Sequence, residues 1–195
     1  MAAEPGEGWA VPAVRLFGSF AGFGAGSVNL AVSSSLLAAP GVSGSVWQPA
    51  LAVVSGGWGA ALILWTVLAL HRGRIVGSGR TVAFLLTASG AHVAALAFSS
   101  DTSSLHLSHL AALLLTLMIV ASGAWLKGRR LRGMDDDGMA PAAARPGILL
   151  LTAFAGAVLV AGIATPGLAA STAGQFAVPH GQHGGPAVPA GHHQR

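Results

Sequence analysis

Five long apolar stretches, none containing Asp, Glu, Lys or Arg, limit what this chain of 195 residues can fold into. Each has 19 to 24 residues, enough for a helix to cross a hydrocarbon layer about 30 Å thick. The stretches are continuous and do not alternate with polar residues, which excludes a β-barrel. The sequence therefore predicts an all-α, polytopic membrane helical bundle with five transmembrane helices. They are expected at Leu16–Ala39, Pro49–Leu70, Thr81–Ser99, Leu105–Leu126 and Gly147–Ala170.

The composition agrees with a bilayer environment. Hydrophobic residues make up 53% of the chain and charged residues only 8%, whereas a soluble domain carries about 25% charged residues. The net charge is +4, but the basic residues cluster beside the apolar stretches without interleaved aromatic residues, so we expect no nucleic acid partner. The absence of cysteine excludes thiolate metal sites and disulfides within the chain.

The basic residues predict the orientation. With five spans, nine of the ten fall on one side, and short loops rich in Lys and Arg stay in the cytoplasm. The N-terminus is therefore expected inside and the C-terminus outside. The expected parts are a cytoplasmic segment 1–15, a transmembrane domain 16–170 and a disordered extracytoplasmic tail 171–195 rich in His, Gly and Pro. The nine residues are Arg15, Arg72, Arg74, Arg80, Lys127, Arg129, Arg130, Arg132 and Arg145.

The composition indicates a bacterial cytoplasmic membrane, because arginine outnumbers lysine nine to one and alanine and glycine are abundant, as in GC-rich genomes. The first apolar stretch is expected to be retained. A cleavable signal peptide begins with basic residues, whereas Glu4 and Glu7 precede this stretch, which is also too long for a signal peptide's apolar core.

Small residues mark expected helix-packing faces. Gly18, Gly22 and Gly26 repeat at four-residue spacing, which lets helices approach closely in a membrane. We favour internal packing by this face over self-association or contact with a partner membrane protein. Asn29, an amide inside the first stretch, is expected to hydrogen-bond a neighbouring helix. Similar clusters occur at Gly56, Gly57 and Gly59 and at Ala153, Ala157 and Ala161.

The histidines carry the functional signal, because seven of eight fall outside or in the outer half of the expected bundle. His106 and His109 lie three residues apart at the start of the fourth stretch, about one helical turn from each other. His92 belongs to the third stretch, which a short loop joins to the fourth. The two helices should be antiparallel neighbours, so the side chains of His92 and His109 can meet if both face inward.

We therefore predict a transition-metal site formed by His92, His106 and His109, with Asp101 as a further ligand. Copper is the first choice, since no thiolate is available and imidazole holds Cu(II) strongly, although another divalent transition metal would also fit. The alternative is structural: His92 would bond a Ser or Thr hydroxyl across a helix pair, while His106 and His109 would sit among lipid headgroups.

The tail holds four more candidate metal ligands, His180, His183, His192 and His193, within a segment rich in glycine and proline. Short histidine-rich tracts can bind Cu(II), Ni(II) or Zn(II). We expect the tail to capture an ion and pass it to the helix histidines. The alternative for this segment is a solvated tail without a specific partner.

Two other functions stay open. The alternative to metal handling is a non-catalytic membrane subunit or assembly factor that packs against partner helices. A third function is that of a membrane protein that holds b-type haem between His92 and another histidine. An enzyme is not favoured, because the chain has no phosphate-binding loop, zinc-protease motif or Gly-x-Ser-x-Gly elbow.

Overall fold

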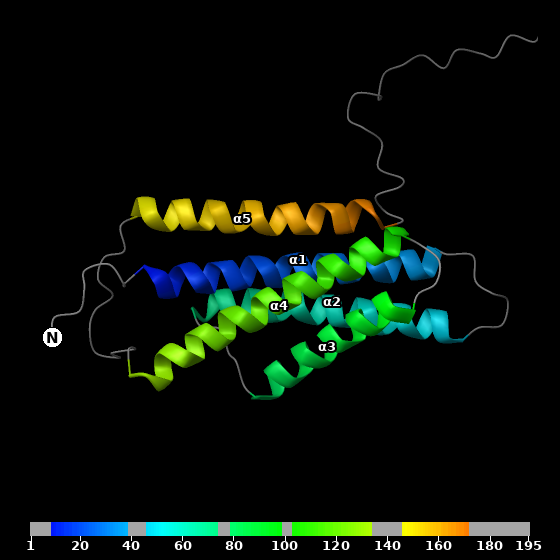
Figure 1. The fold of residues 1–195 in the computed structure, drawn as a ribbon, viewed down its shortest axis with the longest axis horizontal. Helices are drawn as coiled ribbons and strands as arrows, with labels where there is room; N and C mark the ends of the chain where they lie inside the picture. The colour runs from blue at the N-terminus through cyan, green and yellow to red at the C-terminus, as the bar shows by residue number, and fades with distance from the viewer. Residues whose placement is uncertain (1–8, 39–45, 74–78, 99–102, 134–145, 172–195) are drawn as a thin grey trace, which may run out of the picture.

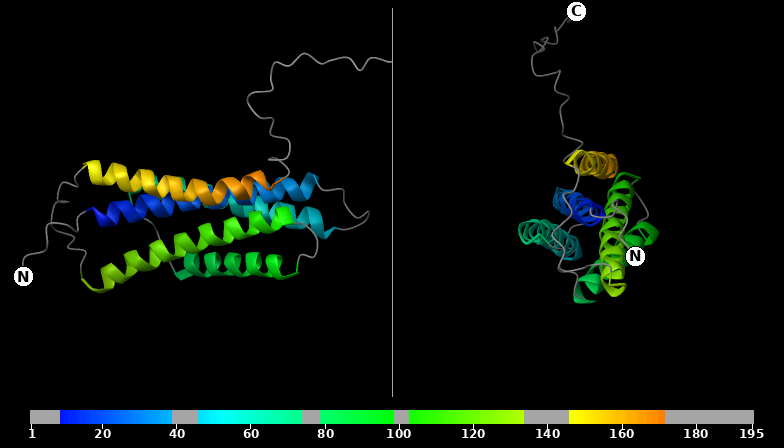
Figure 2. Two further views of the ribbon diagram at one scale, coloured as in Figure 1. Left: turned by 45° about the horizontal axis from the view of Figure 1, so that its top comes forward. Right: turned by 90° about the vertical axis from the view of Figure 1, so that its left-hand side faces the viewer.

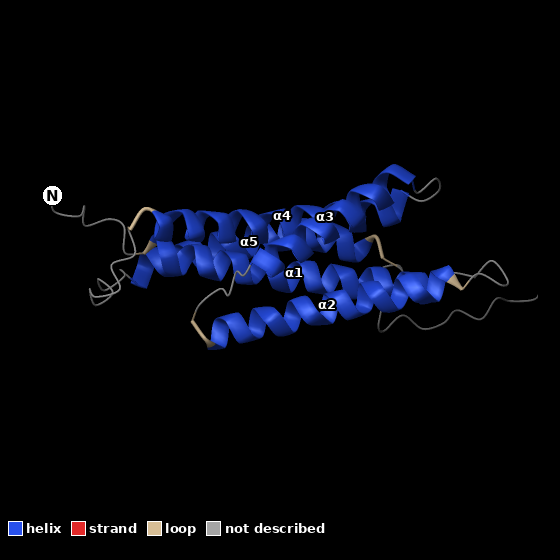
Figure 3. Cartoon of the chain, turned by 90° about the horizontal axis from the view of Figure 1, so that it is seen from below, coloured by secondary structure: helices blue, strands red, loops and turns tan. Residues whose placement is uncertain are grey.

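The computed structural model describes residues 9–38, 46–73, 79–98, 103–133 and 146–171, which form an all-helical bundle (Figures 1 and 3). Each helix is long and apolar enough to cross a membrane, as the sequence predicts. The helices are α1 (Ala10–Ala38), α2 (Trp47–His71), α3 (Gly79–Phe98), α4 (Ser103–Leu131) and α5 (Pro146–Ala169).

Two helices extend well beyond the apolar stretches that predicted them. α1 begins at Ala10, six residues before the predicted start of the first apolar stretch, so Arg15 lies inside the helix. α4 continues to Leu131 and includes Lys127, Arg129 and Arg130. Lys and Arg are good helix formers, so the charges that end an apolar stretch do not end the helix.

The last helix contains an internal proline. Pro166 lies inside α5, which continues to Ala169. Proline removes one backbone donor but keeps its carbonyl, which accepts a hydrogen bond from the Ala170 amide at 3.0 Å. α5 therefore corresponds closely to the predicted fifth stretch, Gly147–Ala170.

α1 is the central helix of the bundle. It packs against α2, α4 and α5, whereas α3 packs against α4 alone among the helices described. Consecutive helices α2 and α3 make no contact with each other, although a short segment joins them. Both panels of Figure 2 show α3 at the edge of the bundle, beside α4 and away from α5.

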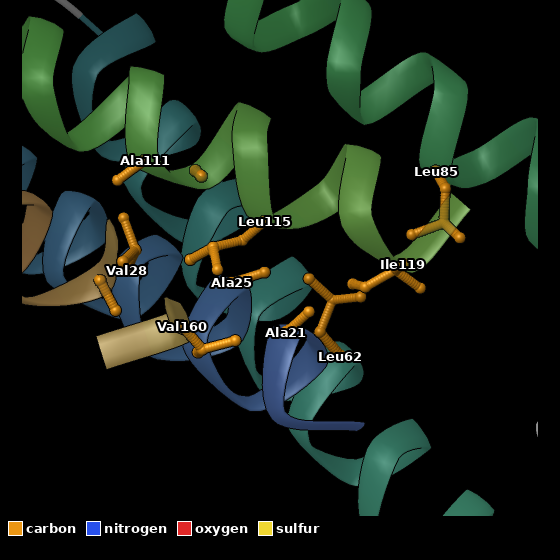
Figure 4. Close-up of a cluster of buried hydrophobic side chains, with 11 residues drawn as sticks. Ala21, Ala25, Val28, Leu62, Leu85, Ala111, Leu115, Ile119 and Val160 are labelled. Atoms are coloured by element: carbon orange, nitrogen blue, oxygen red, sulfur yellow. The ribbon is translucent and has the colours of Figure 1, made fainter. Parts of the chain in front are cut away.

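The buried core draws on all five helices (Figure 4). Small residues dominate the α1 side, where Ala21 and Ala25 are fully buried and allow α2 and α4 to approach. Leu115 of α4 is the largest fully buried side chain and packs into this space. The cluster consists of Ala21, Ala25, Val28, Leu62, Leu85, Ala111, Ala112, Leu115, Ile119, Val160 and Ala164.

The glycine face of α1 is used inside the chain, which confirms the favoured interpretation. A Cβ on Gly22 would overlap the Thr66 hydroxyl of α2, and a Cβ on Gly26 would lie 2.8 Å from the carbonyl oxygen of Gly59. Gly18 is buried as well. A second copy could reach this face only if α2 moved aside.

α5 packs through a different face from the one its alanines suggested. Ala157 and Ala161 are exposed, and the buried residues are Gly156, Val160, Ala164 and Gly167. Because α5 is apolar on all sides, spacing alone does not reveal which of its faces turns inward. The predicted alanine face was therefore wrong.

The expected interhelical bond of Asn29 was also wrong in its side-chain part. Asn29 Nδ2 donates to the carbonyl oxygen of Ala25, one turn earlier in α1, at 2.8 Å. The contact between helices runs the other way, because the Ser55 hydroxyl of α2 donates to the backbone carbonyl of Asn29 at 3.0 Å.

We call one end of the bundle the basic end, because its described residues include seven cationic side chains. α1, α3 and α5 begin there, and α2 and α4 end there (Figure 1). Arg15 Nη1 donates to the Gly73 carbonyl at 2.9 Å and so joins the start of α1 to the end of α2. The seven residues are Arg15, Arg72, Arg80, Lys127, Arg129, Arg130 and Arg132.

Candidate histidine site

α3 presents one narrow face to α4. Its buried residues are Leu85, Ser89 and His92, which follow one another at helical spacing. Leu85 joins the apolar core, and the Ser89 hydroxyl is satisfied within α3 by the carbonyl oxygen of Leu85, at 2.9 Å. His92 is therefore the residue of this face whose polar atoms are directed to another helix.

The side chain of His92 meets His109 of α4. The two Nδ1 atoms lie 3.2 Å apart, the ring centroids lie 5.5 Å apart, and the ring planes are inclined by 47°. The centroid distance exceeds the nitrogen distance by about two ring radii, so the two nitrogens face each other nearly head-on. This geometry suits a hydrogen bond in which one ring carries hydrogen on Nδ1 and the other accepts it.

His92 has a second ring nitrogen that is buried without a partner. The residue is only 7% exposed, and its Nε2 makes no hydrogen bond. A buried polar atom without a partner costs about 1–3 kcal/mol. If His92 donates through Nδ1, its Nε2 carries a free lone pair. If His92 accepts there, its Nε2 carries an unused N–H. Either form leaves an atom ready for a ligand.

The position of His109 is fixed by the residue before it. The Ser108 hydroxyl is fully buried and donates to the carbonyl oxygen of Gly167 in α5 at 2.7 Å. A Cβ on Gly167 would lie 2.6 Å from the Cβ of Ala111, so α4 and α5 touch at this level. Ser108 turned toward α5 leaves His109 turned toward α3.

The other predicted ligands are not gathered around this pair. His106 lies one turn before His109 on α4, but the residues that the structure describes contain no group of three or more His, Cys, Asp or Glu placed to hold a metal. Asp101 and the tail residues His180, His183, His192 and His193 lie outside the described residues.

The spacing of the pair is nevertheless close to what one metal ion requires. Imidazole nitrogens bind Zn²⁺ at about 2.0–2.1 Å, so two of them in tetrahedral geometry lie about 3.3–3.4 Å apart. The observed 3.2 Å is close to this value. The head-on orientation would have to change by rotation of the rings, so that both lone pairs converge on the ion.

Comparisons with protein-family models, curated proteins and solved structures find no match to this chain. Any function inferred for this chain therefore depends on its own residues.

The sequence predicted the meeting of His92 and His109, and the structure confirms the contact. The structural alternative, a Ser or Thr hydroxyl as partner of His92, was wrong, since the partner is another imidazole. The unpartnered Nε2 had no signal in the sequence, because burial of a single ring atom depends on how α3 is rotated against α4.

Proposed function

We propose that the protein crosses the cytoplasmic membrane of a bacterium five times, with its N-terminus inside and its C-terminus outside. Large apolar side chains on the outward faces of the helices support insertion: Leu64, Phe84 and Phe154 are each at least 60% exposed. Water-soluble proteins rarely expose contiguous apolar surface on this scale. The basic end supports the orientation, because Lys and Arg remain in the cytoplasm.

We further propose that the protein binds and handles a transition metal, copper first, at its outer face. The observation that carries this proposal is the buried pair of His92 and His109, with Nδ1 atoms 3.2 Å apart and the His92 Nε2 without a partner. Two neutral imidazoles on neighbouring helices form half of a site that Cu(II) or Zn(II) would occupy. Ionisable residues are rare inside membranes because removing them from water is costly. Those that are present are therefore candidates for a functional role.

The remaining ligands would come from nearby residues and from the tail. A metal held by protein nitrogen and oxygen atoms takes about four ligands. His106, one turn from His109, and Asp101 are the nearest candidates in the sequence. A tail histidine that delivers the ion would stay bound to it at first. The ion would then move by exchanging a tail imidazole for an imidazole of the helix site.

The test measures metal content and Cu(II) or Zn(II) affinity of the full chain purified in detergent. His92→Ala and His109→Ala should each lower the affinity about tenfold or more, a loss at the low end of that expected for disturbing a metal site. His71→Ala is the matched control, since His71 is an exposed histidine at the basic end, away from the pair. Replacing His180, His183, His192 and His193 together should slow metal uptake while leaving the tighter site in place.

Three results would contradict metal handling: no binding, equal loss in the His71 variant, or binding that disappears with the tail alone. None of these results would bear on the proposed membrane topology, because reporter fusions measure topology separately. The two parts of the proposal can therefore fail independently.

A second candidate is a non-catalytic membrane subunit or assembly factor. The observation that favours it is the position of α3, which contacts α4 alone among the described helices and leaves Leu86 and Val93, seven residues apart on one face, more than half exposed. A partner helix could cover this face. A stable partner that co-purifies with the chain and is lost when Leu86→Ala and Val93→Ala are combined would favour this function over metal handling.

The third candidate, b-type haem, is not favoured by the geometry of the pair. Axial imidazoles bind iron from opposite sides of a porphyrin. His92 and His109 are in direct contact, which leaves no space between them for the macrocycle. An absorption band of haem in the purified protein would reverse this preference.

A further inference from the structure

The two imidazoles of the histidine pair face each other along one line. The Nδ1 atoms of His92 and His109 lie 3.2 Å apart, and the ring centroids lie 5.5 Å apart. The lone pair of a ring nitrogen points away from the ring centre, so the two lone-pair directions lie close to the line that joins the rings. An ion on that line would meet one nitrogen from each side, with its two bonds opposite each other.

A linear site at this pair needs a small displacement and no rotation of the rings. Metal–imidazole bonds are about 2.0 Å long, so two nitrogens on opposite sides of one ion lie about 4 Å apart. From the present 3.2 Å, the rings have to separate by about 0.8 Å. Among the described helices α3 packs against α4 alone, at the edge of the bundle (Figure 2). Widening this one contact leaves the packing of α1, α4 and α5 in place.

Two ligands, and not three or four, come together here in the described part of the chain. It contains no group of three or more His, Cys, Asp or Glu placed to hold a metal. The nearby hydroxyls of Ser89 and Ser108 are directed elsewhere, to the carbonyl oxygens of Leu85 and Gly167. Zn²⁺ takes about four ligands, and Cu(II) favours a square arrangement of nitrogen and oxygen atoms. Cu(I), with its filled d shell, is stable with two ligands placed opposite each other.

The surroundings of the pair favour an ion of low charge. His92 lies six residues before the end of α3 and His109 six residues after the start of α4, about 9 Å along each helix. The described residues include neither Asp nor Glu, so none of them supplies a carboxylate to neutralise a bound ion. The cost of taking an ion out of water rises with the square of its charge, and is about fourfold higher for a divalent ion than for a monovalent ion of equal size.

We propose that His92 and His109 bind Cu(I) through their two Nδ1 atoms in a linear, two-coordinate site. The inference rests on the metal handling proposed above and narrows it to one ion: the pair alone takes Cu(I), whereas Cu(II) or Zn(II) needs further ligands. The ring that carries hydrogen on Nδ1 moves it to its own Nε2, so both imidazoles stay neutral and binding releases no net proton. The ion enters and leaves as Cu(I), without electron transfer.

The test uses the full chain in detergent, without oxygen and with Cu(I) supplied as such. A pair-only variant should retain one Cu(I) per chain, whereas its affinity for Cu(II) and Zn(II) should fall about tenfold or more. Adding His92→Ala to it should lower the Cu(I) affinity about tenfold or more, and adding His71→Ala, the matched control, should not. X-ray absorption should show two nitrogen ligands on the copper. The pair-only variant combines Asp101→Asn with alanine at His106, His180, His183, His192 and His193.

A second pair of variants, made in the pair-only chain, separates metal binding from packing. His109→Met replaces the imidazole with a thioether, a soft ligand that selects Cu(I) over divalent ions. It should keep binding Cu(I) and Ag(I), a monovalent ion that stays in one oxidation state, and should lose Zn(II). His109→Leu has a similar volume without a ligand atom and should lose all three ions. Thermal unfolding of both variants shows that the fold is intact.

Three results would overturn the Cu(I) site. They are three or four ligands on the bound copper, a pair-only variant that holds Cu(I) no better after its pair is intact than after His92→Ala, and equal Ag(I) binding by His109→Met and His109→Leu. In each case, Cu(II) or Zn(II) binding by the unmodified chain would leave the proposed metal handling in place. An unmodified chain that binds no metal would overturn both proposals, so the two failures are distinguishable.

Discussion

Gly26 of α1 and Gly59 of α2 meet backbone to backbone. A Cβ on Gly59 would lie 2.7 Å from the Gly26 carbonyl oxygen and 3.0 Å from the Leu30 amide nitrogen. These neighbours are backbone atoms and cannot rotate away as a side chain would. The pair therefore fixes how closely the two helices approach, and close approach is the main source of van der Waals attraction between helices in lipid.

Gly59→Ala should destabilise the bundle by about 1–3 kcal/mol, the usual cost of overpacking. Gly57→Ala is the matched control, since a Cβ at Gly57 meets nothing within 4 Å. The control should be neutral or slightly stabilising, because alanine is a better helix former than glycine by about 1 kcal/mol. Thermal unfolding in detergent compares the two. Equal melting temperatures would show that the glycine contact does not limit the packing.

Breaking the imidazole pair from one side should cost more than removing it. His109→Leu leaves both nitrogens of the buried His92 without partners, and we expect a loss of about 1–3 kcal/mol. The double variant His92→Leu/His109→Leu replaces both polar groups with apolar ones and should recover much of that loss. Chemical or thermal unfolding measures the three proteins. A double variant that is as unstable as the sum of the single ones would mean that the rings contribute by shape and not by hydrogen bonding.

Ser108→Ala should loosen the junction of α4 and α5. It removes the hydroxyl that satisfies the Gly167 carbonyl at 2.7 Å, and interhelical hydrogen bonds in membrane proteins contribute about 0.6 kcal/mol on average and about 1.7 kcal/mol at most. Ser122→Ala serves as control, because its hydroxyl bonds the Met118 carbonyl within α4. Hydrogen exchange at the end of α5 should rise in the first variant only.

The proposed topology predicts the side of each loop. A reporter that is active only outside the cytoplasm should be active when fused after Ser171 and inactive when fused after Gly73 or Gly133. The physical reason is that basic residues near helix ends resist translocation. The opposite result would be an inactive C-terminal fusion of this reporter together with an active C-terminal fusion of a reporter that works only in the cytoplasm. The orientation would then be opposite to the one proposed, and the proposed metal site would face the cytosol.

Hydropathy predicted the helices but not their true ends or their rotation. The five apolar stretches correspond to the five helices because length and apolarity are properties of sequence alone. The sequence did not reveal the start of α1 at Ala10, because the charge of Arg15 ends the apolar stretch but not the helix. The face of α5 was missed because a helix apolar all round carries no periodic signal.

The candidate site was predicted in part for a similar reason. The contact between His92 and His109 was predictable, because the sequence shows a short connection between two antiparallel helices that brings these residues to neighbouring positions. The isolation of His92 Nε2 and the stacking of Arg129 on Trp125 depend on side-chain directions. The sequence did carry a signal for the contact between Arg129 and Trp125, because residues four apart on one helix are neighbours on its surface.

The attachment of α3 by one side has a mechanical consequence. Helices α1, α4 and α5 each pack against the other two, whereas α3 is joined to the described bundle only through its contact with α4. A helix that is packed along one face only can rotate or separate at that face while the remaining helices keep their arrangement. Because His92 and Leu85 both lie on the face of α3 that contacts α4, such a motion would change the distance between the two imidazoles and the packing of Leu85 while the contacts among α1, α4 and α5 persist.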